Sequence, residues 1–188
     1  MYYEAERFAF VATLQDRWQV VYRELEGLTS GNFIAWPERH LYGKGWDIFG
    51  LYAFGLRIED NCRLCPETTK LVEQIPGLQT AGFSKLAPGA HIAPHTGYPE
   101  GLLRCHLGLV VPENCALRVG PEVRTWQPGR CLVFDDTAEH EAWNRSERDR
   151  VVLLLDFKVP PGVLPDSEKS GERKTLLDSV RSLFGRKR

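Results

Sequence analysis

The chain has 188 residues, of which 43% are hydrophobic and 11% aromatic. That length fits one domain with a sizeable core and argues against general disorder. The formal net charge is -1, so the sequence lacks the basic footprint that indicates nucleic-acid binding. No apolar run is long enough for a membrane-spanning helix, and the N-terminus does not read as a secretory signal. We therefore expect a cytoplasmic protein with no transmembrane segment.

The first part of the chain, to about residue 76, is predicted to be helical. Apolar residues at helical spacing predict a helix over 6–26, and Gly27 follows as a stop signal. Turn formers and aromatics over 30–47 indicate a structured loop, and 48–57 reads as a buried strand. A short helix is expected from Pro66 to about residue 74.

Cys62 and Cys65 form a C-x-x-C pattern in this part of the chain. A zinc site would need a second such pair or nearby histidines, and neither follows. We therefore favour reduced thiols in a loop before the helix that begins at Pro66 over a metal or redox site.

The second part of the chain is predicted to be β. Short apolar segments alternate there with turn signals such as PG, VPEN and QPG; the segments are 79–87, 102–111, 115–119, 131–135, 141–144 and 150–159. Many short strands at this spacing predict an antiparallel sandwich or jelly roll. The expected organisation is one mainly β domain over 1–160, with its β core at about 79–159.

Residues 161–188 are expected to lie outside that domain. They read as a linker followed by a short basic amphipathic helix. Such a tail can make a weak contact with an anionic membrane surface or a protein partner, or it can pack on its own domain.

Two of the five histidines stand where a metal site is plausible. His95 lies in the turn PHTG after a short strand, and His140 ends the segment VFDDTAEH. Imidazole suits iron, copper, nickel and zinc. Arg150, at the start of the next strand, can present a guanidinium fork to a carboxylate. Arg104 and His106 alternate on one strand and share a face. Together these residues predict a metal bound with a dianionic small acid, for which 2-oxoglutarate is the first candidate.

Several segments resemble the aspartyl/asparaginyl β-hydroxylase family over roughly residues 46–158. They are FSKLAPG, HIAPHTG, LRCHLGLVVP, LRV, W-x-PG, FDDTAEHEAWN and RVVLLLDF. The resemblance implies a double-stranded β-helix (jelly-roll, cupin-like) core with N-terminal helices packed on it. It also implies an enzyme that uses Fe(II), O2 and 2-oxoglutarate as cosubstrate.

The same resemblance assigns roles to particular residues. It implies that His95 and His140 are the iron ligands. Arg150 and Ser84 would hold the distal carboxylate of 2-oxoglutarate.

Arg104 and His106 would line the cosubstrate and metal region. Trp46 falls where the family often has an active-site aromatic. His40 and His91 match no motif and are expected to be surface or loop residues.

One expected ligand is missing from the sequence. Non-haem oxygenases of this chemistry mostly use two histidines and a carboxylate, and the carboxylate usually stands two residues after the first histidine. Here that residue is Gly97. In a hydroxylase, water would fill the position, and Asp136 is our candidate catalytic carboxylate to hold that water. Alternatively, Asp135 and Asp136 only cap a turn.

The expected function is therefore an Fe(II)- and 2-oxoglutarate-dependent dioxygenase that hydroxylates a carbon and releases succinate and CO2. The family suggests the Cβ of an aspartyl- or asparaginyl-type group in a peptide, a protein or a small molecule. Two alternatives stay open. One is a 2-oxoglutarate-dependent halogenase, with a halide beside Gly97, and the other is a non-catalytic cupin-like module that binds a metal or a ligand.

Overall fold

A computed structural model describes residues 1–97 and 101–159. Its helices are α1 (Ala9–Asp16), α2 (Trp18–Glu26), α3 (Glu59–Leu64) and α4 (Pro66–Val72), with short 3-10 turns at Ala5–Arg7, Ser30–Asn32 and Arg39–Leu41. Its strands are β1 (Tyr2–Tyr3), β2 (Ile34–Ala35), β3 (Trp46–Ala53), β4 (Leu56–Arg57), β5 (Leu78–Leu86), β6 (His91–His95), β7 (Leu102–Val110), β8 (Cys115–Val119), β9 (Glu122–Arg124), β10 (Cys131–Phe134), β11 (His140–Asn144) and β12 (Arg150–Lys158).

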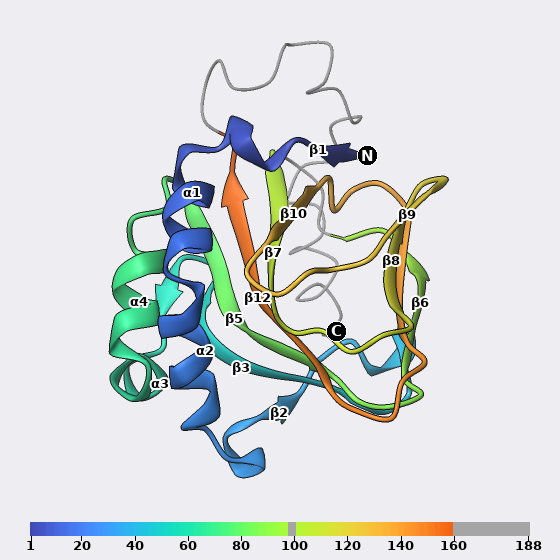
Figure 1. Ribbon diagram of the computed structural model, residues 1–188, viewed down its shortest axis with the longest axis horizontal. Coiled ribbons are helices and arrows are strands. Elements are labelled where there is room, and N and C mark those ends of the chain that lie inside the picture. Colours follow the sequence, from blue (N-terminus) through green and yellow to red (C-terminus); the bar gives the residue numbers. More distant parts are fainter. Residues whose placement is uncertain (98–100, 160–188) are drawn as a thin grey trace, which may run out of the picture.

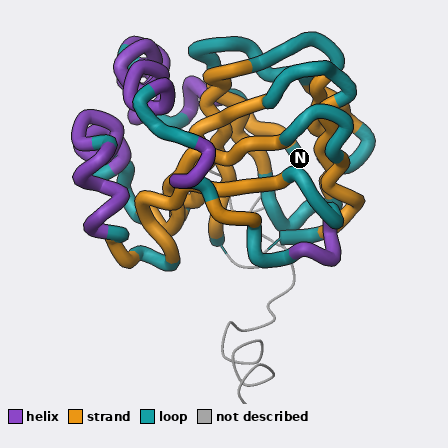
Figure 2. The backbone as a smooth tube through the Cα atoms, turned by 90° about the horizontal axis from the view of Figure 1, so that it is seen from below, coloured by secondary structure: helices purple, strands orange, loops and turns teal. Residues whose placement is uncertain are grey.

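The strands form two antiparallel sheets that face each other. The larger sheet has the order β1-β10-β7-β12-β5-β3-β2, with β4 paired to β3, and the smaller has the order β6-β11-β8-β9. The four helices lie against the outer face of the larger sheet, and the smaller sheet lies on its other side (Figures 1 and 2). The prediction of a mainly β jelly-roll core with N-terminal helices packed on it is confirmed.

The apolar run of β12 shows why the larger sheet is buried on both faces. Odd-numbered residues from Val151 to Phe157 belong to the hydrophobic cluster under the helices. Val152 and Leu154 belong to a second cluster between the two sheets. Because side chains alternate along a strand, Arg150 and Asp156 share the inner face with this second cluster. The polar residues of the site are therefore set into an apolar barrel interior.

Two of the predicted elements take a different form in the structure. The helix expected over 6–26 is broken at Arg17, whose backbone is not helical. The break sets Trp18 against Gly129, where any side chain at position 129 would collide with the indole ring. The strand expected over 48–57 is a hairpin instead, because Phe54 and Gly55 both adopt positive φ and reverse the chain.

The region around the C-x-x-C pattern is ordinary core. Cys62 and Cys65 are both buried, and the Cys62 thiol donates to the carbonyl of Leu51. Burial raises the pKa of Cys65 to about 12. Cys62 lies in α3, a helix that was not predicted, and α4 begins at Pro66 as expected.

Within the described ranges, no helix is both long enough and apolar enough to cross a membrane. The linker and basic tail predicted over 161–188 lie outside those ranges.

Candidate functional site

His95 and His140 lie side by side at one end of the smaller sheet. They are directly paired across β6 and β11, and their ring centroids are 4.2 Å apart. The Nδ1 atom of His95 lies 2.8 Å from the carbonyl oxygen of Ala93, and that of His140 lies 2.9 Å from the carbonyl oxygen of Ala138. A carbonyl only accepts, so each Nδ1 carries the proton and each Nε2 keeps a free lone pair. This is the arrangement in which imidazole binds a metal.

Both imidazoles are held in their neutral form. Burial lowers the pKa of His95, and it lowers the pKa of His140 to about 3. Neutral imidazole is the form that coordinates metal ions, so no proton has to be removed at neutral pH.

Asp136 stands beside this pair, in the turn between β10 and β11. One of its carboxylate oxygens lies 3.3 Å from Nε2 of His140. A side chain at Gly97 would overlap the carboxylate of Asp136, and the backbone N–H of Gly97 donates to the Asp136 carbonyl at 2.7 Å. The space beside Cα of position 97 is therefore filled by a carboxylate that comes from another segment.

The neighbouring Asp135 makes different contacts. Its Oδ1 accepts hydrogen bonds from the backbone N–H and the hydroxyl of Thr137, at 2.9 and 2.7 Å. Asp135 thus stabilises the turn, as short polar side chains commonly do. Asp136 faces inward.

Arg104 binds two buried carboxylates. Its Nη1 lies 2.6 Å from Asp136, while Nε and Nη2 donate to the two oxygens of Asp156 at 2.7 and 3.0 Å. Burial alone lowers the pKa of Arg104, but the two carboxylates outweigh it and raise the pKa above its ordinary value.

His106 lies deeper in the barrel on the same face of β7. The indole N–H of Trp126 donates to its Nδ1 at 3.3 Å, which leaves the proton of the neutral ring on Nε2. Burial and the positive charges of Arg150 and Arg104 hold the pKa of His106 far below its usual range. In the described part of the chain, Nε2 of His106 is buried without a hydrogen-bond partner. A buried donor of this kind is costly unless a ligand accepts from it.

Arg150 is the second buried group that lacks a full set of partners. Its side chain is 1% exposed and its guanidinium carbon lies 4.5 Å from the centre of the Trp126 ring. Within residues 1–97 and 101–159 it makes no ion pair, and its Nε has no hydrogen-bond partner. Burial lowers its pKa to about 10. A buried charged guanidinium with few partners can bind an anion that enters the barrel.

Ser84 and Trp46 line the wall next to Arg150. Nη1 of Arg150 makes a long contact of 3.4 Å with the carbonyl of Ser84, and the Ser84 hydroxyl accepts from the Trp46 indole at 3.0 Å. Trp46 is buried and stacks on Trp36.

The remaining histidines lie apart from this group. His91 is half-exposed and pairs with Glu141 at 2.7 Å, and His40 lies in a surface 3-10 turn. The described residues contain no group of three or more His, Cys, Asp or Glu side chains arranged for a metal. The site is a histidine pair with one carboxylate alongside.

Two residues of the site were missing from the sequence prediction, Trp126 and Asp156. Trp126 lies in a W-x-P-G turn, and its indole contacts both His106 and Arg150. Asp156 is a lone acid in an apolar strand, and that isolation was a signal that it needs a buried partner.

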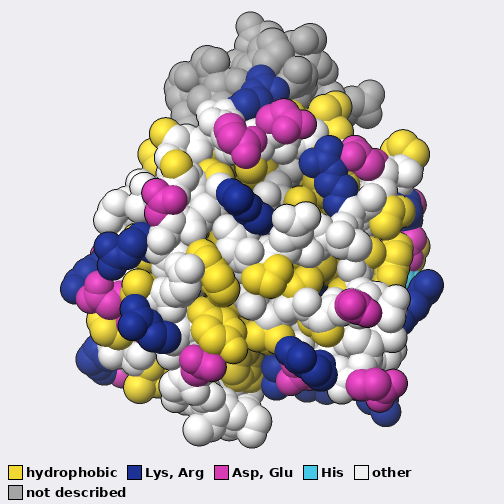
Figure 3. Space-filling model, viewed as in Figure 1, with side chains coloured by type: hydrophobic (Ala, Val, Ile, Leu, Met, Phe, Trp, Pro, Cys, Tyr) yellow, Lys and Arg dark blue, Asp and Glu magenta, His cyan; other side chains and the backbone are white. Residues whose placement is uncertain are grey.

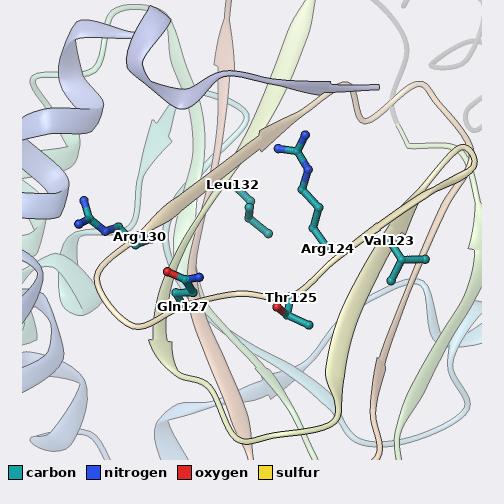
Figure 4. Close-up of a pocket in the computed structure, with 6 residues that line it drawn as sticks. All are labelled: Val123, Arg124, Thr125, Gln127, Arg130 and Leu132. Atoms are coloured by element: carbon teal, nitrogen blue, oxygen red, sulfur yellow. The ribbon is translucent and has the colours of Figure 1, made fainter.

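A cavity of about 480 Å³ lies along the segment that runs from β9 into β10 (Figure 4). It is lined by Val123, Arg124, Thr125, Gln127, Arg130 and Leu132. Leu132 is paired with His106 across β10 and β7, so the cavity wall adjoins the site. In Figure 4, Arg124 extends toward β1, whereas Arg130 points toward the helices.

On the face seen in Figure 3, Lys and Arg are interspersed with Asp and Glu around apolar side chains.

The fold and the polar barrel interior define a jelly-roll protein of the cupin type with a histidine pair at one end. Residues 15–160 match the model of the family described as aspartyl/asparaginyl beta-hydroxylase, so the chain belongs to this hydroxylase family. The family resemblance that the sequence motifs indicate is confirmed.

Two curated relatives show how far the similarity extends. The chain is 49% identical over 118 residues to an ornithine lipid ester-linked acyl 2-hydroxylase of Rhizobium tropici, covering 61% of this chain and 42% of the relative. It is 36% identical over 161 residues to the human aspartyl/asparaginyl beta-hydroxylase, covering 80% of this chain and 21% of the relative. The chain thus spans less than half the length of either relative.

A similar solved structure is the cupin domain of an XRE-family transcriptional regulator from Enterobacter cloacae. Its TM-score is 0.44, with 16% identity over 62% of this chain and all of that chain.

Proposed function

We propose that the protein is an Fe(II)- and 2-oxoglutarate-dependent dioxygenase that hydroxylates an unactivated carbon. The observation that carries this proposal is the histidine pair. The rings of His95 and His140 lie 4.2 Å apart between centroids, and each Nδ1 is fixed by a backbone carbonyl, so that each Nε2 keeps its lone pair.

The residues present fit an iron ion. In each neutral ring Nε2 is an acceptor, and Nε2 of His140 faces an oxygen of Asp136, which is also an acceptor, at 3.3 Å. Two acceptors at that distance repel each other. The guanidinium of Arg104, 2.6 Å from that oxygen, offsets part of the repulsion, and a metal ion or a donating water bound at Nε2 would offset the rest. His95 and His140 would hold the iron, and Asp136, whose carboxylate fills the space beside Gly97, would hold a water bound to it.

The residues also fit 2-oxoglutarate, which is a dianion. Arg150 would bind the distal carboxylate, and the Ser84 hydroxyl would donate to the same group. The free Nε2–H of His106 would donate to an oxygen of the cosubstrate on the side nearer to the iron. Iron and 2-oxoglutarate together supply oxygen activation, for which these side chains have no equivalent.

Binding of the cosubstrate would also explain why the fold tolerates Arg150. An unpaired buried cation destabilises a protein, whereas a cation that meets a carboxylate on binding contributes affinity and selectivity. Arg104 already binds two carboxylates, so we assign it to the metal side of the site rather than to the distal carboxylate.

Succinate formation tests the proposal directly. The protein is incubated with Fe(II), 2-oxoglutarate and candidate substrates, and succinate and product mass are measured. His95→Ala and His140→Ala should each abolish turnover, whereas His91→Ala, on the same strand as His95, should leave it unchanged. Full turnover in either ligand variant would refute the assignment.

The same assay separates the alternatives. A halogenase would give a product that carries chlorine when chloride is supplied. A binding module would bind Mn(II) and 2-oxoglutarate without releasing succinate from any substrate.

For the substrate, we propose a molecule that joins an apolar part to an anionic group. The Rhizobium tropici relative is named for hydroxylation of an acyl chain, and it is the more similar of the two relatives over the matched region. The cavity along the β9–β10 segment offers both chemistries, with Val123 and Leu132 apolar and Arg124 and Arg130 cationic. An acyl substrate and an aspartyl peptide should be tested in parallel. A Leu132→Trp variant, which fills the cavity, should raise KM for the true substrate and leave 2-oxoglutarate binding intact.

A further inference from the structure

Asp156 is the only acidic residue in β12, and it is 8% exposed. Its neighbours Leu155 and Phe157 are fully buried on the opposite face. A buried carboxylate in an apolar strand destabilises the fold unless a buried cation or hydrogen-bond donors pair with it.

The carboxylate meets Arg104 in a bidentate pair. Asp156 and Arg104 are directly opposite each other across β12 and β7, and Nε and Nη2 of Arg104 each donate to one Asp156 oxygen. Two parallel hydrogen bonds fix both the position and the plane of a guanidinium.

A guanidinium that is fixed along one edge has its third nitrogen fixed as well. That nitrogen, Nη1 of Arg104, lies 2.6 Å from Oδ1 of Asp136. Oδ1 of Asp136 is also the atom that lies 3.3 Å from Nε2 of His140. The chain of contacts therefore runs from β12 through β7 to the metal side of the site.

We infer that Asp156 is a positioning residue, which orients Arg104 so that Arg104 holds the Asp136 carboxylate in the space beside Gly97 and His140. This inference rests on the proposed function, since it assumes that a metal ion binds next to Asp136. A competing account is that the Asp156–Arg104 pair only joins two strands.

Mn(II) binding by the full chain separates these accounts. Asp156→Asn keeps the shape of the side chain but removes its charge and one acceptor. We expect it to weaken Mn(II) binding about 10-fold, in line with the effect of outer partners on metal sites. Asp47→Asn is the matched control, since Asp47 forms an ion pair with Lys85 elsewhere in the same sheet. It should not change the affinity.

A double-mutant cycle distinguishes a positioning role of Asp156 from a purely structural role. If Asp156 acts through Asp136, the variant Asp156→Asn/Asp136→Asn should bind Mn(II) about as weakly as Asp136→Asn alone. Additive losses, or an unchanged affinity in Asp156→Asn, would overturn the inference.

A second variant covers the case in which Asp156→Asn does not fold. Asp156→Glu keeps the negative charge opposite Arg104 but moves the carboxylate by one methylene, so it shifts the guanidinium without leaving a buried charge unpaired. This variant should fold, as judged by denaturation, and lose Mn(II) affinity, whereas wild-type affinity would overturn the inference. If the wild-type protein itself binds no Mn(II) or Fe(II), it is the proposed function that fails.

Discussion

The carboxylate of Asp136 occupies the volume in which a side chain at Gly97 would begin. A Cβ atom at position 97 would overlap both oxygens and the carboxyl carbon of Asp136. Glycine is therefore required at 97 for steric reasons, and its φ is not in the left-handed region. In the sequence this glycine looks like a lost ligand, but in the structure it makes room for a carboxylate that comes from another turn.

Gly97→Ala should consequently displace Asp136 and weaken Mn(II) binding by roughly 10-fold, as expected for loss of an outer partner of a metal site. Isothermal titration with Mn(II) measures this. Gly31→Ala is the control, because a Cβ there would make only an ordinary contact with Thr29. The exchange variant Gly97→Asp/Asp136→Gly should recover part of the affinity that Gly97→Asp loses, and no recovery would contradict the steric account.

Some of this site was predictable because short motifs carry it. His95 and His140 stand in segments whose turn and strand signals place them at strand ends, and Arg104 and His106 follow the alternation of one strand. The strand over 115–119 was predicted with the observed limits. Local sequence also accounts for β12, whose apolar run reflects burial on both faces.

The contacts of Asp156 and Trp126 could not be predicted in the same way. The bond between Arg104 and Asp156 joins residues 52 positions apart, and the bond between Trp126 and His106 joins residues 20 positions apart. These contacts depend on strand register and on the path of a loop, which a single sequence does not determine. The break at Arg17 was missed for a similar reason, since the helix there meets Gly129 from a distant turn.

Arg150→Met should stabilise the unliganded protein while it destroys the anion site. Burial lowers the pKa of Arg150 to about 10, so the folded state bears a cost for keeping this group charged at neutral pH. Removing that cost should raise the free energy of unfolding by roughly 1–3 kcal/mol. Urea denaturation measures the gain, and titration with 2-oxoglutarate in the presence of Mn(II) measures the loss of binding.

Arg63→Met serves as the control for Arg150→Met, since Arg63 is an exposed arginine in α3. It should change the free energy of unfolding by no more than about 0.5 kcal/mol and leave cosubstrate binding unchanged. A destabilised Arg150→Met variant that still binds 2-oxoglutarate would assign Arg150 a purely structural role.

His95 and His140 should make stability fall as the pH drops below neutrality. In the unfolded chain a histidine takes up a proton near pH 6.5, whereas in the folded protein burial lowers the pKa of His140 to about 3. Between these values the unfolded state binds more protons, so the free energy of unfolding decreases with falling pH. Each such histidine contributes at most about 1.4 kcal/mol per pH unit.

Urea denaturation of the metal-free protein between pH 5 and 7 checks this dependence. His140→Asn should have a shallower slope than the wild type in this window. Equal slopes for His140→Asn and the wild type would show that His140 is protonated in the folded protein.

Trp126→Phe should weaken binding of 2-oxoglutarate and leave Mn(II) binding unchanged. Phenylalanine keeps a ring over Arg150 but cannot donate to Nδ1 of His106. Without that donor, the proton of His106 is free to move to Nδ1, and Nε2 would then accept rather than donate. The loss of one hydrogen bond and of the fixed tautomer corresponds to about 1 kcal/mol, or roughly a 5-fold weaker affinity. Trp143→Phe, at a surface pair in which Arg145 lies over Trp143, is the matched control. If Trp126→Phe bound the cosubstrate as tightly as the wild type, the free Nε2–H of His106 would not be part of the cosubstrate site.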